Sequence, residues 1–421
     1  MSTVKFVHCA DLHLDTPFRG LANIAPEVAA ELNAATFKSY DNIVDLAIRE
    51  QVDFVVIAGD VFNGKDRSLR AQFRFREGLN RLSEKGIQSF VAFGNHDPLS
   101  GWSHTLEWPK LAHWFGSKDV DICEVSCNGN VVATVHGISF EKEAVTEDLA
   151  AKFHAPLDGV PSVAVLHCNV GGQTGHDNYA PTTVEELSSI GFDYWALGHV
   201  HTHDILKMEG PAIVYPGCSQ SRQPNETGAK GCCVVTLSDS APPDIRFVPT
   251  DTVRYHKGDV DISGSASIDD VQKAVLRYCE SLAELSEVRH AVGRVVLSGK
   301  TPMYRELVRG SALKDLHQEI RSALLVRQPW ILIDKLVLDT RGTYDIERLR
   351  EQEDFVGDLV SAFDNLLTSD DEGLEAVRQE LETDFAAWQG RRFLETLTPD
   401  EMRALVAQAM QRTLDRVVAE D

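Results

Sequence analysis

The stretch VKFVHCADLH, residues 4–13, decides the fold. It is a short apolar run followed directly by two side chains that can bind metal ions, Asp11 and His13. The same order returns in FVVIAGD (54–60), FVAFGNHD (90–97), VAVLH (163–167) and YWALGHVH (194–201). Short apolar runs bounded by Gly or polar residues are typical of buried strands. We therefore expect a buried strand in each, and a further one over residues 131–135.

Helical spacing links these strands. Apolar residues recur three or four positions apart between the first two runs and between the second and third: Phe37, Tyr40, Val44 and Ala47, then Phe75, Leu79 and Leu82. A capping box from Thr183 to Glu186 predicts another helix, which ends at Gly191. Strands that alternate with helices predict an α/β domain.

The His, Asp and Asn residues stand where the strands end. In open α/β sheets the loops at the carboxyl ends of the strands converge on one crevice, so these clusters should meet there. Each motif alone has a plain structural explanation, such as Gly-Asp in a turn. Five clusters at one edge favour a metal site instead. The candidate ligands are Asp11, His13, Asp60, Asn95, His167, His199 and His201.

This ligand set indicates the metal and the chemistry. Two carboxylates, one amide oxygen and four imidazoles suit Mn, Fe or Zn at two adjacent positions and suit the all-oxygen sites of Ca poorly. Paired ions of this kind activate water and bind the oxygens of a phosphoryl group. We therefore expect metal-assisted phosphoester hydrolysis. The chain has no GxxxxGK[ST] sequence, so any ATP dependence is expected to come from a partner.

Composition limits the other classes. The 421 residues are 43% apolar, enough for sizeable buried cores, and no run of about 18 apolar residues indicates a membrane span. The eight cysteines form no CxxC pair, and the first residues do not look like an export signal. We expect a cytoplasmic protein with reduced thiols and no contact with membranes.

Net charge first argues against a nucleic-acid enzyme. Lys and Arg number 41 and Asp and Glu number 64, a net of −23 that repels phosphate backbones. Residues 345–421, however, hold 20 acids and 8 bases, a net of −12, which leaves −11 for the first 344 residues. Basic residues gather beside the expected site, and we consider them as DNA contacts or as a solvated helix face: Lys65, Arg67, Arg70, Arg74 and Arg76, with Arg222 and Lys230 further along.

Three regions are expected along the chain. The stretch SDSAPPDIRFVP (238–249) breaks the strand and helix pattern, so we predict a loop there and a boundary near residue 250. Residues 251–342 then form a smaller α/β unit. Residues 345–421 become helical and acidic, with three apolar stripes at helical spacing.

The motif order DxH, GD, GNHD, H and GHxH resembles the calcineurin-type metallophosphoesterase superfamily. ADLHLDTPFRGL, GDVFNGKDRS and YPGCSQSRQPNETGAKG are further similar to DNA-repair exonucleases of the SbcD and YhaO type, bacterial relatives of the double-strand-break repair nuclease. The resemblance implies an αββα β-sandwich over residues 1–250, a capping domain and a helical C-terminal segment. One departure is Asn63, where many relatives carry His.

The resemblance also implies roles for single residues. Asp11, His13, Asp60 and His201 would hold one metal ion, and Asp60, Asn95, His167 and His199 the other, with Asp60 shared. His96 would orient or protonate the leaving group. Asp97 would fix an imidazole from outside the ligand set. His8, His136 and His176 match no ligand position and are expected to be structural or on the surface.

The resemblance implies that the protein is a Mn-dependent DNA exonuclease, with endonuclease activity on single strands or hairpins. It also implies an SMC-like coiled-coil ATPase bound by the C-terminal helices. Whether two chains form a homodimer through the helices near 30–50 and 70–85 stays open. Two alternatives stay open. One is a phosphatase or cyclic-nucleotide phosphodiesterase for small substrates, and the other is a scaffold without catalysis.

Overall fold

The computed structural model describes most of the chain, in two compact units. The described residues are 3–16, 18, 21, 28–64, 68–101, 106–127, 129–156, 159–172, 177–238, 241–287, 289–384 and 397–420. The first unit comprises residues 1–256, 282–292 and 327–334, and the second comprises 257–281, 293–326 and 335–421.

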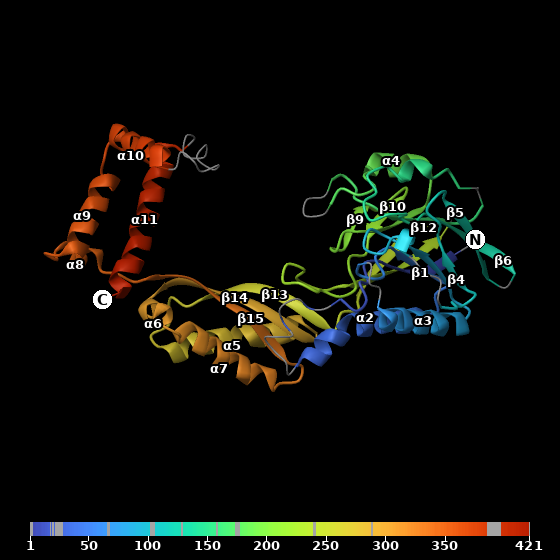
Figure 1. Ribbon diagram of the computed structural model, residues 1–421, viewed down its shortest axis with the longest axis horizontal. Helices are drawn as coiled ribbons and strands as arrows, with labels where there is room; N and C mark the ends of the chain where they lie inside the picture. Colours follow the sequence, from blue (N-terminus) through green and yellow to red (C-terminus); the bar gives the residue numbers. More distant parts are fainter. Residues whose placement is uncertain are drawn as a thin grey trace. The chain divides into compact units, whose positions relative to one another are not determined.

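Two six-stranded sheets form the centre of the first unit (Figure 1). The first has the order β12-β11-β1-β2-β3-β4, with bounds Ala241–Pro249, Gly231–Ser238, Thr3–Cys9, Phe54–Ala58, Gln88–Ala92 and Ala112–Trp114. The second has the order β5-β6-β7-β8-β10-β9, with bounds Asp121–Cys127, Asn130–Gly137, Ser162–His167, Tyr194–Gly198, Ala212–Tyr215 and Asp204–Lys207. β1 to β4 run parallel, and so do β6, β7, β8 and β10, so each sheet has one edge where carboxyl ends gather.

Helices cover the outer faces of both sheets. Successive side chains of a strand point to opposite faces, so β1 sends Phe6 into the layer between the sheets and Val7 toward α2 (Ala29–Arg49) and α3 (Leu69–Glu84). The outer face of the second sheet packs against α4 (Val184–Ile190) and neighbouring loops. Figure 1 shows α2 and α3 on one side of the sandwich and α4 on the other. The expected αββα fold is confirmed.

The prediction of a loop over residues 238–249 is wrong, because Ala241–Pro249 is strand β12. Proline cannot donate a ladder hydrogen bond, so the adjacent Pro242 and Pro243 favour a break in the sequence pattern. β12 lies at the end of its sheet and pairs only with β11 in the strand order. An edge strand needs hydrogen bonds on one side alone, so it tolerates these prolines.

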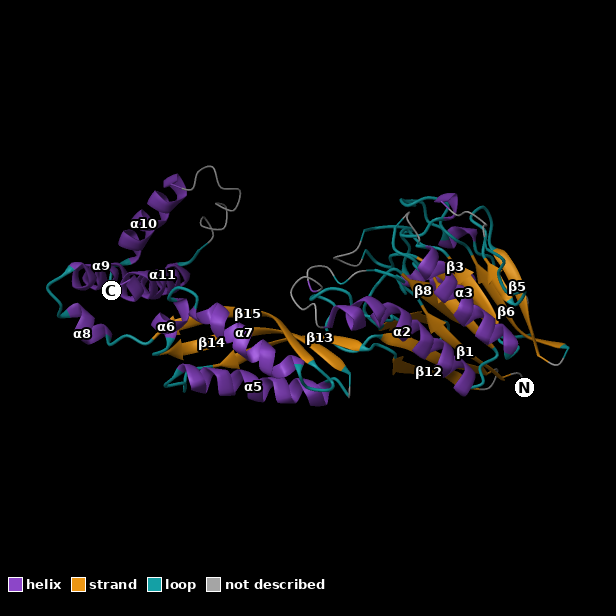
Figure 2. Ribbon diagram, turned by 60° about the horizontal axis from the view of Figure 1, so that its bottom comes forward, coloured by secondary structure: helices purple, strands orange, loops and turns teal. Residues whose placement is uncertain are grey.

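A three-stranded sheet follows the sandwich along the chain (Figure 2). Its strands in spatial order are β13 (Val253–Asp261), β14 (His290–Thr301) and β15 (Ile331–Gly342). Its helices are α5 (Ile268–Leu285), α6 (Tyr304–Val308) and α7 (Ala312–Leu325). This is the small α/β unit expected from the sequence, and the domain limits at 250 and 342 stay predictions.

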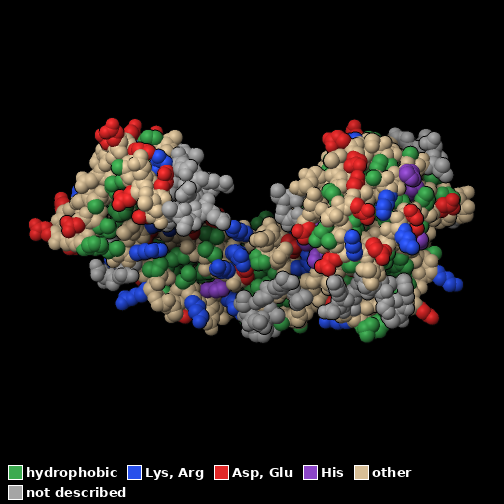
Figure 3. Space-filling model, turned by 45° about the horizontal axis from the view of Figure 1, so that its top comes forward, with side chains coloured by type: hydrophobic (Ala, Val, Ile, Leu, Met, Phe, Trp, Pro, Cys, Tyr) green, Lys and Arg blue, Asp and Glu red, His purple; other side chains and the backbone are tan. Residues whose placement is uncertain are grey.

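The C-terminal part is helical, with α8 (Ile346–Arg350), α9 (Phe355–Leu367), α10 (Asp371–Asp384) and α11 (Pro399–Glu420). Val356 and Val360 of α9 pack against Met410 and Leu414 of α11. Acidic side chains gather on the face of these helices shown in Figure 3. Every helix within the described ranges is too short or too polar to cross a membrane.

Candidate metal centre

The ends of the parallel strands are joined by backbone hydrogen bonds. The N–H of Asp11 donates to the carbonyl of Gly59 (3.0 Å), and the N–H of His13 donates to the carbonyl of Asp60 (3.0 Å). Asp11, His13, Asp60 and His199 all have left-handed backbone, with φ of 51°, 43°, 52° and 99°. Such backbone costs roughly 1–3 kcal/mol per non-glycine residue and is concentrated at functional sites. The strain therefore marks this edge as one that positions side chains.

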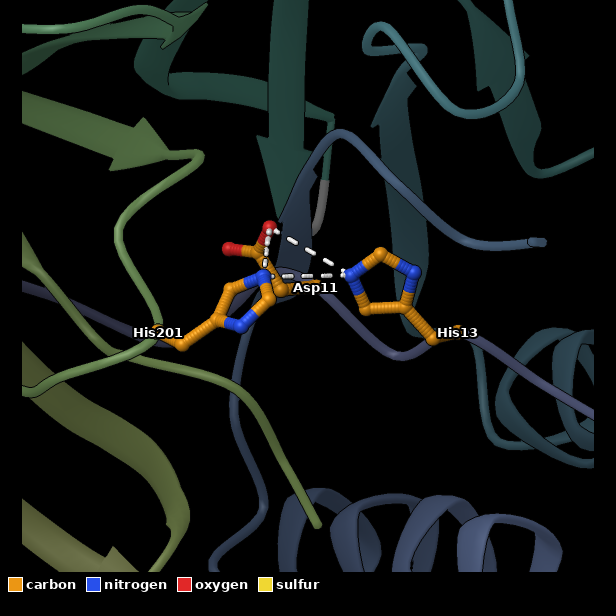
Figure 4. A group of neighbouring side chains, drawn as sticks. All are labelled: Asp11, His13 and His201. Carbon is orange, nitrogen blue, oxygen red and sulfur yellow. Dashed lines mark hydrogen bonds and ion pairs between the residues drawn. The ribbon is translucent and has the colours of Figure 1, made fainter. Parts of the chain in front are cut away.

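One group of candidate ligands consists of Asp11, His13 and His201 (Figure 4). Nε2 of His13 lies 3.3 Å from Nε2 of His201, and Oδ1 of Asp11 lies 3.9 Å and 3.8 Å from these two nitrogens. Two ligands about 2.1 Å from one ion are roughly 3.0–3.4 Å apart when their angle at the ion is 90–110°. The three atoms need only a small contraction to reach one ion.

A second group continues from the first through Asp60. Oδ2 of Asp60 lies 3.8 Å from Nε2 of His13 and 3.6 Å from Nε2 of His167. Oδ1 of Asn95 lies 3.1 Å from Nε2 of His167 and 3.2 Å from Nδ1 of His199. All seven predicted ligands thus lie together, and Asp60 stands between the two groups.

In three of the imidazoles, the ring nitrogen that points away from the other candidate ligands contacts a hydrogen-bond acceptor. Nδ1 of His167 contacts the carbonyl of Ala58 at 2.9 Å, and Nε2 of His199 contacts the carbonyl of Asp177 at 2.8 Å. Nδ1 of His201 contacts Glu226 at 2.8 Å. An acceptor on one ring nitrogen places the hydrogen there and leaves the other nitrogen free to bind a metal.

Burial shifts these groups toward their neutral forms. It raises the pKa of Asp11 to about 6, and burial followed by the Asp97 charge raises the pKa of Asp60 well above its usual range. It also lowers the pKa values of His13 and His167 well below their usual range. Among the described residues, the ion-pair partners of both carboxylates are imidazoles alone. Neutral imidazoles can act as ligands, and divalent ions would keep the carboxylates ionised, so the donor set fits a pair of metal ions.

His96 and Asp97 border this cluster. The imidazole of His96 is exposed and lies edge-on to His13, with ring centroids 5.0 Å apart, while its backbone N–H donates to Oδ1 of Asp60 (2.9 Å). The role expected for Asp97, that of fixing an imidazole, stays a prediction. Its carboxylate accepts hydrogen bonds from the backbone N–H groups of Gly94, Val61 and Phe62, so it braces the two loops that carry Asp60 and Asn95.

The glycines before three of the candidate ligands allow close packing. A Cβ on Gly94 would lie 2.4 Å from Oδ1 of Asp60, and one on Gly198 would lie 1.8 Å from the carbonyl oxygen of Ala58. A Cβ on Gly59, whose φ is +95°, would lie 2.3 Å from Nδ1 of His167. Glycine at these places lets the two sheets bring their ligands together.

The basic residues that the structure describes have different surroundings, and their contact with DNA stays a prediction. Lys65 and Arg67 lie outside the described residues. Arg70 is exposed, 3.5 Å from Asp15, whereas Arg74 pairs with Asp41 at 2.6 Å. The guanidinium of Arg76 lies over the ring of Phe73, and Arg222 lies beside His201. Lys230 is buried, and its Nζ donates a hydrogen bond to the carbonyl of His201.

The structure adds one residue that sequence reasoning missed. Glu226 is buried, and its carboxylate contacts His201. It follows the GHxH motif by 25 residues and has no strand-end motif beside it; the one signal was its place within YPGCSQSRQPNETGAKG, the segment that resembles the family. His8 is buried between the hydroxyl of Tyr194 and the carbonyl of Leu197, and His136 is also buried, which fits the structural roles expected for both. His176 lies outside the described residues.

Comparison with known proteins agrees with this geometry. Residues 4–203, which include all seven candidate ligands, match the family described as calcineurin-like phosphoesterase. The chain carries a calcineurin-like metallophosphoesterase domain. Residues 255–341, after the phosphoesterase domain, match the family described as metallophosphoesterase YhaO, middle domain.

Relatives of this chain include bacterial and archaeal proteins. The metallophosphoesterase YhaO of Bacillus subtilis (strain 168) is 38% identical over 62% of this chain and 64% of its own length. The DNA double-strand break repair protein Mre11 is 25% identical in Haloferax volcanii, over 57% of this chain and 52% of that protein. In Archaeoglobus fulgidus it is 29% identical, over 51% and 49%. The chain therefore spans about half to two thirds of the length of these relatives.

Proposed function

We propose that this metallophosphoesterase is a Mn-dependent DNA nuclease that hydrolyses phosphodiester bonds. The observation that carries the proposal is the meeting of Asp11, His13, Asp60, Asn95, His167, His199 and His201 at one strained edge. The relatives whose names include DNA double-strand break repair support DNA as the substrate. Mn is proposed over Fe and Zn from the family resemblance.

Divalent ions in such a site supply Lewis-acid activation of water and of phosphoryl oxygens. The protein supplies position. The backbone bonds between β1 and β2 fix Asp11 and Asp60, and the carboxylate of Asp97 fixes the loops around them. His96 stands exposed beside the cluster, where its imidazole can give a proton to the leaving oxygen. Arg222 stands near His201, where its guanidinium can bind a phosphate oxygen.

A paired assay tests the substrate. The full chain with Mn²⁺ should degrade linear DNA, with a chelator as the control that stops the reaction. The same preparation is offered a nitrophenyl phosphodiester and a cyclic nucleotide. Hydrolysis of the small esters without attack on DNA would reject the nuclease and support the alternative of a small-substrate phosphodiesterase.

We also propose that the C-terminal helices bind a coiled-coil ATPase of the SMC type. Phe355 at the start of α9 is 68% exposed, and Leu405 on α11 is 39% exposed, although both are large apolar side chains. Exposed apolar residues on an acidic helical surface fit a protein partner. Phe355→Asp in the full chain should reduce co-purification with such an ATPase at least tenfold while DNA hydrolysis by the isolated chain is kept. Undiminished co-purification would place the docking surface elsewhere.

A further inference from the structure

Glu226 contacts two of the groups that line the edge of the metal centre. Its Oε1 lies 2.8 Å from Nδ1 of His201. Its Oε2 accepts a hydrogen bond from the backbone N–H of Arg222 (2.7 Å). Gln223 donates to the same Oε1 (3.2 Å). The residue is only 6% exposed, so these bonds are shielded from water.

A separate metal site is the first explanation to consider. His201, Cys218 and Glu226 offer ligand atoms within 4.8 Å of one another. The guanidinium of Arg222, however, lies 3.6 Å from Oε1 of Glu226 and 3.5 Å from Nδ1 of His201. A fixed positive charge therefore stands where an added cation would bind, and repulsion disfavours a third ion there. The carboxylate of Glu226 therefore serves a role other than binding a third metal ion.

We propose that Glu226 is a positioning residue that sets the tautomer and direction of His201 and holds Arg222 at the rim of the metal centre. This inference rests on the proposed function of the site. Because Oε1 accepts the hydrogen of Nδ1, Nε2 of His201 keeps its lone pair toward Asp11 and His13. The second oxygen anchors the backbone of Arg222, so one carboxylate orders a metal ligand and a phosphate-binding cation together.

Replacement of Glu226 should therefore weaken metal binding more than it lowers the stability of the fold. Outer-sphere partners of a ligating histidine are worth about 10- to 100-fold in metal affinity. Glu226→Ala should lower Mn²⁺ affinity by about that factor. Glu226→Gln, close to Glu in shape, has one oxygen for two donors, the Nδ1 of His201 and the N–H of Arg222. It should lose affinity about tenfold.

The experiment measures Mn²⁺ binding to the metal-free full chain by calorimetry. Thermal unfolding shows that each variant is folded, and long-range ¹H–¹⁵N spectra report which nitrogen of His201 carries the hydrogen. We expect the Nδ1–H form in the wild type, its loss in Glu226→Ala and a smaller share of it in Glu226→Gln, whose single amide oxygen can serve only one of the two donors. Gln223→Ala is the matched control, since Gln223 touches the same oxygen without touching His201, and it should change the affinity less than about twofold. Arg222→Ala should raise KM for DNA and leave Mn²⁺ affinity at or above the wild-type value.

Several outcomes separate the inference from the proposed function. Wild-type affinity in Glu226→Gln with His201 still in the Nδ1–H form would overturn the role of Glu226. If Glu226→Ala fails to fold, the Gln variant still decides. A wild-type chain that binds Mn²⁺ but leaves DNA intact would overturn the nuclease, while the affinities would still decide the role of Glu226. A wild-type chain that binds no Mn²⁺ would overturn both.

Discussion

Asp60→Asn should abolish metal-dependent hydrolysis, with a loss in kcat/KM of about 10³-fold or more. Its Oδ2 lies between the two ligand groups, 3.8 Å from His13 and 3.6 Å from His167, so it is the carboxylate best placed to serve both ions. Asparagine removes the negative charge and replaces one oxygen with a group that cannot bind a cation. Calorimetry should then find one Mn²⁺ per chain at most, against two for the wild type.

Asp53→Asn is the matched control, because Asp53 precedes the same strand at its opposite end. There its carboxylate accepts the backbone N–H of Lys5 at 2.8 Å, away from the candidate ligands. This variant should keep both metal sites and full activity. Two ions bound with wild-type affinity by Asp60→Asn would show that the bridging position is assigned to the wrong residue.

The strands that carry the site could be predicted from the sequence for a physical reason. Each is a β-branched or aromatic run buried on both faces, so its signal is a continuous apolar stretch that stops at a polar residue. That is why the sequence alone places Asp60 and Asn95 at the ends of successive strands. In the structure both side chains lie at the same edge, where each of them contacts Nε2 of His167.

Long-range polar contacts could not be predicted in this way. Glu226 lies in the loop between β10 and β11, and its contact with His201 joins positions 25 residues apart with no apolar periodicity to connect them. The sequence predicts that Arg74 contacts DNA or solvent, and in the structure it pairs with Asp41 on the neighbouring helix α2. Such partners depend on how elements pack, and local periodicity carries no information about packing between distant segments.

His96→Ala should lower kcat on DNA by about 10²- to 10⁴-fold while both metal ions stay bound. The imidazole lies outside the ligand groups, and the contact of this residue with Asp60 is made by its backbone N–H, which alanine keeps. If His96 protonates the leaving oxygen, the loss should depend on the leaving group. An alkoxide from DNA needs the proton, whereas nitrophenolate leaves without it, so a nitrophenyl phosphodiester should be affected far less.

His154→Ala is the matched control, since His154 is an exposed histidine of the same unit that belongs to none of the candidate ligand groups. Equal losses on DNA and on the nitrophenyl ester would mean that His96 holds the phosphate and donates no proton. Full DNA cleavage by His96→Ala would remove it from the reaction. If the wild type and His96→Ala both bound Mn²⁺ and DNA without cleaving it, the site would serve only as a scaffold. A strong loss on DNA with a weak loss on the activated ester is the one pattern that general-acid catalysis by His96 produces.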